Sequence, residues 1–393
     1  MKGLIKKALL GAVATASIAG GTAPVHAATI VLTDIGGVAG SKAERGFKAA
    51  AEYWSNVLTN NVTINLNVGF SSLPPNVLGS TSSNYDVSTV SSFYQQLATT
   101  GNSTLDAVAV ANLQPLVGGA LTMLTPGYTN PATKRGADTT TTVLDADGSA
   151  NNSYLAATTA NMKALGFTGY SGADATIQFS SDFAFDFDPR NGVTAGTSDF
   201  IGVAIHEIGH ALGFVSGVDT YDYYGCPNGP RCATGKTLNF NNYAIGDPLD
   251  LFRYSAPGVL DWKPGDEAYM SIDGGATQLL GRAGFSTGDY NGDTSQASHW
   301  KANNTCSNFI GIMNPYLCSG RVAAVTAQDL GAMDAIGWNT KVDVLSNPSY
   351  RFTSAMAFMG VPEPAIWMEM ILGFGLLGGV LRTSRKRVSV RFA

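Results

Sequence analysis

The chain has 393 residues, of which 45% are hydrophobic and only 13% are charged, and its formal net charge is −5. A chain of this length can bury a large core. Its surface must take its polarity from Ser, Thr, Asn and Gly, a composition that suits an exported bacterial protein better than a cytosolic one. The acidic balance argues against a nucleic-acid partner, because phosphate binding requires clustered basic residues.

The first 27 residues have the three parts of a secretory signal peptide. A short basic start is followed by an apolar stretch of small residues at 8–20, and the segment ends in Val25-His26-Ala27. Small residues at the −3 and −1 positions are typical of a cleavage site. An N-terminal membrane anchor is the alternative, but the apolar run is short and interrupted by glycine. We therefore expect the mature chain to begin after Ala27.

The next part of the chain carries patterns of both helix and strand. Phe47, Trp54 and Leu58 recur at three- and four-residue spacing, which is typical of one buried helix face. Residues 62–70 alternate between apolar and polar, as a strand with one buried face does. We predict, in chain order, an apolar run at 28–32, a helix at 43–58, a strand at 62–70, a Ser/Asn/Pro-rich loop at 71–88 and a helix at 89–98.

Residues 121–171 offer little periodicity, apart from a weak helical pattern at 154–165. Residues 175–187 alternate again, and they predict one or two strands that lead into the next helix. Ser198 or Asp199 can cap the start of that helix, whose apolar pattern ends near Gly213.

This helix contains the motif His206-Glu207-Ile208-Gly209-His210. The two histidines are one helical turn apart, so their imidazoles lie on one face and can converge on a single ion. Glu207 is rotated about the helix axis, where it can reach a water on the metal without binding the metal. Zinc lowers the pKa of such a water towards ~7. Glu207 can then accept a proton as the water attacks a peptide carbonyl and pass it to the leaving amine.

The small number of histidines points to a third ligand. The chain has four, and His26 lies in the predicted signal peptide, which leaves only His206, His210 and His299. A catalytic zinc commonly has three protein ligands and a water, and this count fits that set. Two ordinary histidines on a solvated helix face are the alternative interpretation of the motif.

The motif resembles that of the metzincin metallopeptidases, HExxHxxGxxH or HExxHxxGxxD with a Met-containing turn downstream. The matching residues are His206, Glu207, His210 and Gly213. The position three after the glycine is Ser216, which departs from the family pattern. The third ligand must therefore come from elsewhere in the chain.

Two candidates remain for that ligand. Asp219 is close by and offers an acceptable oxygen. Leishmanolysin-type metzincins instead insert a long segment before the third histidine, and His299-Trp300 followed by the turn at 311–315 is similar to their arrangement. We favour His299 and keep Asp219 as the alternative. The resemblance implies that Met313, in the turn at 311–315 (the Met-turn), lies beneath the zinc as a soft apolar contact.

The resemblance also implies an α+β fold, a zincin catalytic domain over residues 28–340 with a mixed sheet, an active-site helix and a C-terminal helix after the Met-turn. Thr326 can cap that last helix, which is predicted to end at Gly337. Tyr316, three residues after Met313, is a candidate oxyanion stabiliser by analogy, with a packed surface tyrosine as the alternative.

Two further features concern covalent and ionic cross-links. Four cysteines in an exported chain favour two disulfides over a thiolate zinc site. Three pairings are open, and the simplest joins Cys226 to Cys232 and Cys306 to Cys318. Residues 289–293 match part of a calcium loop, but its sixth-position Gly and twelfth-position Glu are absent, so structural Ca²⁺ is only a weak prediction and a polar turn is the default.

The C-terminal end resembles the PEP-CTERM sorting signal. Pro362-Glu363-Pro364 precedes an apolar span at 365–381 and a basic tail that extends to Arg387, after a linker predicted at 341–361. The span is about as long as a bilayer core requires. The resemblance implies a Gram-negative host, export across the inner membrane, a transient membrane stage, processing by exosortase-type machinery and delivery to the cell surface or the extracellular space. A plain C-terminal anchor is the alternative.

The sequence therefore predicts a secreted or surface-delivered endopeptidase with one zinc ion, which acts on peptide or protein substrates. Two other functions remain: a surface or matrix protein that uses this fold only for binding, and a zinc hydrolase of another amide bond. Glu207 argues against the first, because a binding protein does not need that carboxylate.

Overall fold

The computed structural model describes residues 27–302, 305–306 and 308–360. The predicted signal peptide, except for Ala27, lies outside these residues, and so does the PEP-CTERM-like segment with its membrane helix at 365–381. Within the described ranges, no helix combines the length and apolarity that are needed to cross a bilayer. The fold is a mixed α+β arrangement of helices and several small sheets, as predicted.

A four-stranded mixed sheet forms one half of the fold, in the order β1-β2-β8-β3. Its strands are β1 (Thr29–Gly36), β2 (Thr63–Ser71), β8 (Ala175–Ser180) and β3 (Gly79–Ser83). β1, β2 and β8 run parallel, whereas β3 is antiparallel to β8 and lies at the edge. In β2, Ile64, Leu66 and Val68 are buried and alternate with less buried residues, because neighbouring side chains of a strand point to opposite faces.

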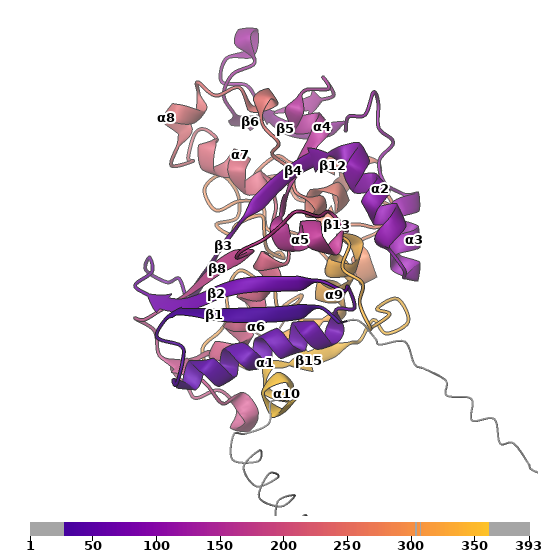
Figure 1. The fold of residues 1–393 in the computed structure, drawn as a ribbon. Coiled ribbons are helices and arrows are strands. Elements are labelled where there is room, and N and C mark those ends of the chain that lie inside the picture. The colour runs from indigo at the N-terminus through magenta and orange to yellow at the C-terminus, as the bar shows by residue number, and fades with distance from the viewer. Residues whose placement is uncertain (1–26, 303–304, 307, 361–393) are drawn as a thin grey trace, which may run out of the picture.

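Helices α1 (Lys42–Val57) and α6 (Phe200–Ala211) pack together against this sheet (Figure 1). Their contact is aromatic: the ring centroids of Phe47, Phe179 and Phe200 lie 4.6 to 5.0 Å from one another, one ring from each of α1, β8 and α6. All three rings are buried. Burying rings of this size contributes about 2 kcal/mol each, so the sheet fixes α6 firmly.

The other half of the fold, in the upper part of Figure 1, is built on a five-stranded sheet in the order β13-β11-β12-β5-β6. Its strands are β13 (Tyr269–Met270), β11 (Arg253–Ala256), β12 (Val259–Asp261), β5 (Met123–Gly127) and β6 (Asp138–Asp145). Three two-stranded pairs complete the strands: β4 (Tyr85–Thr89) with β7 (Tyr154–Thr158), β9 (Phe185–Asp186) with β10 (Ser198–Asp199), and β14 (Ala324–Thr326) with β15 (Arg351–Thr353).

The remaining α-helices are mostly short. They are α2 (Val90–Thr100), α3 (Thr104–Ala111), α4 (Ala150–Ser153), α5 (Thr159–Ala164), α7 (Val218–Tyr224), α8 (Cys232–Gly235), α9 (Ala327–Ala335) and α10 (Ser354–Gly360). Among the short 3-10 helices, the one at Pro248–Phe252 begins after Asp247.

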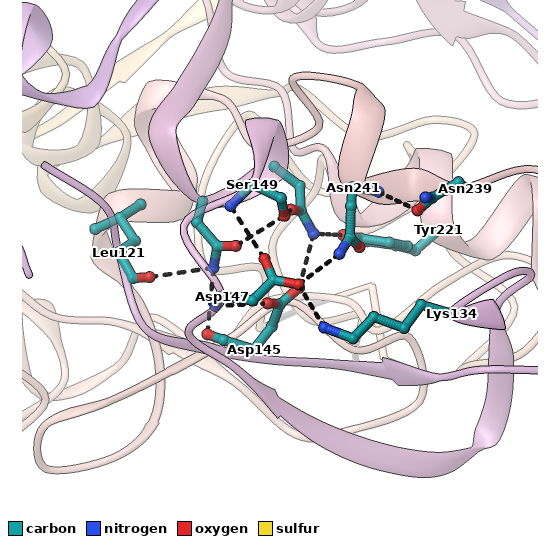
Figure 2. A network of polar contacts seen from close by, with 10 residues as sticks. Leu121, Lys134, Asp145, Asp147, Ser149, Tyr221, Asn239 and Asn241 are labelled. Atoms are coloured by element: carbon teal, nitrogen blue, oxygen red, sulfur yellow. Dashed lines mark hydrogen bonds and ion pairs between the residues drawn. The ribbon is translucent and has the colours of Figure 1, made fainter. Parts of the chain in front are cut away.

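A polar network fixes the end of β6 against α4 and α7 (Figure 2). Asn151 donates from Nδ2 to Asp145 Oδ2 at 2.8 Å and lies 3.1 Å from the Tyr221 hydroxyl. Lys134 and Asn241 both contact Oδ2 of Asp147, at 2.9 and 2.6 Å. Buried polar groups are stable only when they are paired, and this network pairs them. It holds α7, the first helix after α6, in place.

The predicted helix at 43–58 and strand at 62–70 are confirmed within one or two residues. The prediction of a loop at 71–88 was wrong, because this segment contains β3 and most of β4. β3 is an edge strand of small polar residues, so it lacks the apolar alternation that would have revealed it. The weak helical pattern at 154–165 also covers a strand, β7, before α5 begins.

Of the segment predicted as a linker, 341–361, the described residues 341–360 contain a strand and a helix that pack against the domain. It contains β15, which pairs with β14, and α10, whose Ala357 and Phe358 are buried. The Ser354 hydroxyl donates to the carboxylate of Asp199, the N-cap of α6. A strand of three residues and a helix of seven are too short for a clear sequence pattern.

Both disulfides join cysteines that are close in sequence. Cys226 pairs with Cys232, between α7 and α8. Cys306 pairs with Cys318, so this bond encloses the Met-turn at 311–315. These are the two local pairings that the sequence favoured.

A buried carboxyl on α9 should make stability depend on pH. Asp334 accepts a hydrogen bond from the Ser103 hydroxyl at 2.7 Å, and burial together with the charge of Asp106 raises its pKa to about 7. The charged form is therefore disfavoured in the folded state, and stability falls as pH rises from the unfolded pKa near 4 to the folded pKa. We expect Asp334→Asn to gain about 1 kcal/mol or more at pH 8 and almost nothing at pH 4.

Urea unfolding of the two proteins between pH 4 and pH 8 measures this gain. Asp289→Asn removes an exposed carboxylate and serves as the matched control. An equal gain for Asp334→Asn at both ends of the range would contradict the prediction.

Candidate metal centre

Helix α6 carries two of the three histidines that meet at the centre of the fold. Asp199 caps it, with the carboxylate accepting from the backbone N–H of Gly202 at 3.0 Å. Nε2 of His210 lies 3.0 Å from Nε2 of His206 and 3.2 Å from Nε2 of His299. Nε2 of His206 and Nε2 of His299 are 3.3 Å apart. Among the described residues, these three side chains form the one group of His, Cys, Asp or Glu that could hold a metal ion.

The outer nitrogens of the three rings fix their tautomers. Nδ1 of His206, His210 and His299 faces a main-chain oxygen, of Ile312 at 2.8 Å, Phe214 at 2.7 Å and Gln296 at 3.2 Å respectively. A carbonyl oxygen only accepts, so Nδ1 must carry the proton and Nε2 a lone pair.

Three lone pairs at this separation repel one another unless a cation lies between them. Ligands about 2.0–2.1 Å from a tetrahedral zinc are about 3.3 Å apart, and the measured separations are close to that. The donor set therefore fits a divalent metal of the zinc type, with a position left for a water or a substrate oxygen.

The imidazoles are neutral in this environment. Burial lowers the pKa of all three, and the proximity of the other histidines lowers it further for His210, to about 3, and for His299. Neutral imidazole is the form that binds a metal. Ring orientation and protonation state thus both favour metal binding.

Glu207 lies beside the three histidines and is held by the edge strand β3. The Thr81 hydroxyl is 2.7 Å from Oε2 of Glu207 and 2.9 Å from its main-chain oxygen. Burial raises the pKa of Glu207 to about 7, and the Thr81 hydrogen bond opposes this shift. A methyl group at Gly79 would come within 2.8 Å of Oε1, so the absence of a side chain there makes room for the carboxylate.

Asp219, the alternative ligand, does not belong to the histidine group. Its carboxylate accepts from the backbone N–H of Ala297 at 2.6 Å and of Ser298 at 3.1 Å, and from the Ser298 hydroxyl at 2.5 Å. These contacts fix the two residues before His299. Asp219 therefore positions the segment that carries the third histidine.

Met313 is buried directly against α6. Gly209 lies between the two helical histidines, and a side chain there would come within 2.5 Å of Met313 Sδ. The Met313 carbonyl accepts from the backbone N–H of Trp300, the residue after His299. The Met-turn is thus in contact with both segments that supply histidines.

The carboxylate of Asp329 joins the Met-turn, the residue after His299 and the start of α9. It accepts from the backbone N–H of Ile312 at 2.8 Å, from Nε1 of Trp300 at 2.8 Å and from the backbone N–H of Thr326 at 2.7 Å. Thr326 is the N-cap of α9, as predicted. Asp329 therefore links the start of this helix to the Met-turn.

The other predicted residues lie farther from the histidines. Tyr316 lines the same cleft as the histidines and is 38% exposed, and its role in stabilising an oxyanion stays a prediction. In the segment predicted as a weak calcium loop, the backbone N–H groups of Tyr290 and Asn291 donate to Asp222 at 2.9 and 2.8 Å. That segment is a turn held by a buried aspartate.

Sequence reasoning did not identify Thr81, Gly79 or the ligand-positioning role of Asp219. The first two lie on β3, whose small polar residues were predicted to form a loop. The hydrogen-bond partners of Asp219 are 78 and 79 positions away, so no local pattern could reveal them. Comparison with protein-family models, with curated proteins and with solved structures finds no match to this chain.

Proposed function

We propose that this protein is a zinc-dependent endopeptidase. The observation that supports the proposal most strongly is the convergence of three neutral imidazoles, each with its Nε2 lone pair directed at the others, beside a buried carboxylate. His206, His210 and His299 would hold the ion. Zinc bound there supplies a polarised water and an electrophile for the substrate carbonyl.

Glu207 supplies the proton transfer. A carboxyl with a pKa near neutrality can both accept and return a proton at physiological pH, which is the property a general base and acid needs. It takes the proton from the attacking water and gives it to the leaving amine. Thr81 keeps the carboxylate in position through these transfers.

The edge of β3 supports a peptide as the substrate. This strand pairs with β8 on one side, and no described strand pairs with its other side. Residues 78–81 of this segment line the cleft together with Glu207. An extended peptide can add to such an edge by main-chain hydrogen bonds and present a carbonyl to the site. A small-molecule amide would make no use of this edge.

The metzincin resemblance agrees with this proposal. The Met-turn contact beneath α6, the distant third histidine and the closing helix α9 are the features that the family implies. Export, and sorting through the PEP-CTERM-like segment by an exosortase, are part of the same proposal and rest on the sequence alone. The two disulfides fit an oxidising compartment.

Metal analysis combined with a peptide-library digest tests the proposal. We expect about one zinc per chain and cleavage of internal peptide bonds, lost on treatment with a chelator and restored by zinc. A protein that binds zinc but cleaves no peptide would support the binding or other-amide alternatives. Absence of bound metal would contradict both the zinc peptidase and the zinc hydrolase of another amide bond.

A further inference from the structure

The end of the cleft beyond His210 is acidic. The segment after α6 places Ser216 and Asp219 in the cleft wall, and Asp247 lines the same cleft from another loop. Asp250 lies behind them, fully buried. Three carboxylates thus approach one another beside the metal centre.

Two of these carboxylates, those of Asp250 and Asp219, accept hydrogen bonds from other groups of the protein. Asp250 accepts from the Ser216 hydroxyl at 2.5 Å and from the backbone N–H groups of Gly217 and Asp247 at 2.7 and 2.9 Å. Asp219 holds the segment before His299, as described above. Both carboxylates therefore have hydrogen-bond partners within the protein, and these partners account for their burial.

Asp247 is different. It is only 5% exposed, and its Oδ1 has no hydrogen-bond partner among the described residues. Burial, then the charges of Asp250 and Asp219, raise its pKa well above the ordinary value. The Asp247 side chain also accepts from the backbone N–H of Asp250 in a capping box, so Oδ1 is the oxygen left over. A buried oxygen without a partner costs stability of the order of a few kcal/mol unless a cation or a donor comes to it.

The protein's own cations do not supply this partner. Arg253 is buried nearby, and its charge acts on Asp250 and Asp219. For Asp247, the causes of the raised pKa are burial and then the charges of Asp250 and Asp219. Among the described residues, the three aspartates do not form a group of side chains close enough together to hold a metal ion by themselves. Because Asp247 lines the cleft, an organic cation that enters the cleft can reach this carboxylate.

We propose that this acidic end of the cleft is a specificity subsite for an arginine or lysine side chain of the peptide substrate, with Asp247 as its ion-pair partner. The inference rests on the proposed peptidase function and names the substrate class that this function selects. Ile245 and Tyr85 also line the cleft, and the charge of Asp247 acts on Tyr85, so a long basic side chain can lie along them and bring its charge to the carboxylate. Asp219 and Asp250 add to the negative potential there.

Matched peptides test the subsite directly. Two fluorogenic peptide sets differ only in arginine or citrulline, a neutral analogue of the same shape, placed in turn at each position around the scissile bond. With the zinc-loaded protein, we expect kcat/KM to favour arginine by about 10- to 100-fold at one position. Asp247→Asn should bring this ratio close to one by slowing the arginine peptide and leaving the citrulline peptide unchanged.

Asp289→Asn is the matched control, because Asp289 lines the same cleft but is exposed, and it should keep the wild-type ratio. Asparagine is close to aspartate in shape and also caps helices, so the Asp247→Asn melting temperature should not fall. Equal hydrolysis of the peptide pair by the wild-type protein, or an undiminished preference in Asp247→Asn, overturns the subsite alone. Failure to hydrolyse any peptide would instead overturn the proposed function.

Discussion

Glu207→Gln is expected to lower kcat for peptide hydrolysis by about 10²- to 10⁴-fold while zinc remains bound. Glutamine has nearly the same shape and can still contact the Thr81 hydroxyl, so the helix and the histidines should keep their positions. What it lacks is the ability to accept a proton, and the buried carboxyl with its pKa of about 7 is the group placed to do so. The measurements are steady-state kinetics on one peptide and the zinc content of the same samples.

Glu44→Gln is the matched control for this experiment. Glu44 lies in the first turn of α1 and forms a solvent-exposed ion pair with Lys48 at 2.6 Å. Such pairs contribute at most about 1 kcal/mol, so activity should not change. Undiminished hydrolysis by Glu207→Gln would refute the role of Glu207 as general base, and loss of zinc would show that Glu207 takes part in metal binding.

His299→Ala is expected to abolish tight zinc binding and, with it, peptide hydrolysis. Removal of one of three imidazoles leaves two ligands on one helix, which cannot complete a tetrahedral site. Asp219→Asn should have a smaller effect, because the amide oxygen can still accept from the Ser298 hydroxyl or a backbone N–H. Substitutions that loosen the support of a ligand typically weaken metal binding by about 10- to 100-fold.

Zinc titration against a competing chelator measures both variants on one scale. The thermal shift on adding zinc provides a second readout, because a ligand that binds only the folded state raises the melting temperature. His299→Ala should show no shift and Asp219→Asn a reduced one. The reverse order would assign the third ligand to Asp219.

The sequence indicated which three histidines converge, because the pattern that brings them together follows local rules. Helical periodicity predicted His206 and His210 on one face, and His299 was the one histidine left outside the motif and the predicted signal peptide. The start of α9 at Thr326 was also predictable, since a cap and an acidic residue three positions later form a local signature.

The residues around the centre were less predictable because their roles depend on distant partners. Asp219 has the chemistry of a metal ligand, and only the fold shows that its oxygens are taken by the segment at 297–298. β3 has small polar side chains, so its position at the sheet edge and its contact with Glu207 could not be read from hydrophobic pattern. The short length of α10 similarly concealed the helix that supports the cap of α6.

The hydrogen bonds of Asp329 place completion of the histidine group late in the synthesis of the chain. Ribosomes release a chain from its N-terminus, and α6 therefore emerges more than a hundred residues before the residue that holds the Met-turn and Trp300 in place. Until Asp329 has emerged, the segment with His299 lacks this anchor, and an unfinished chain has no complete site.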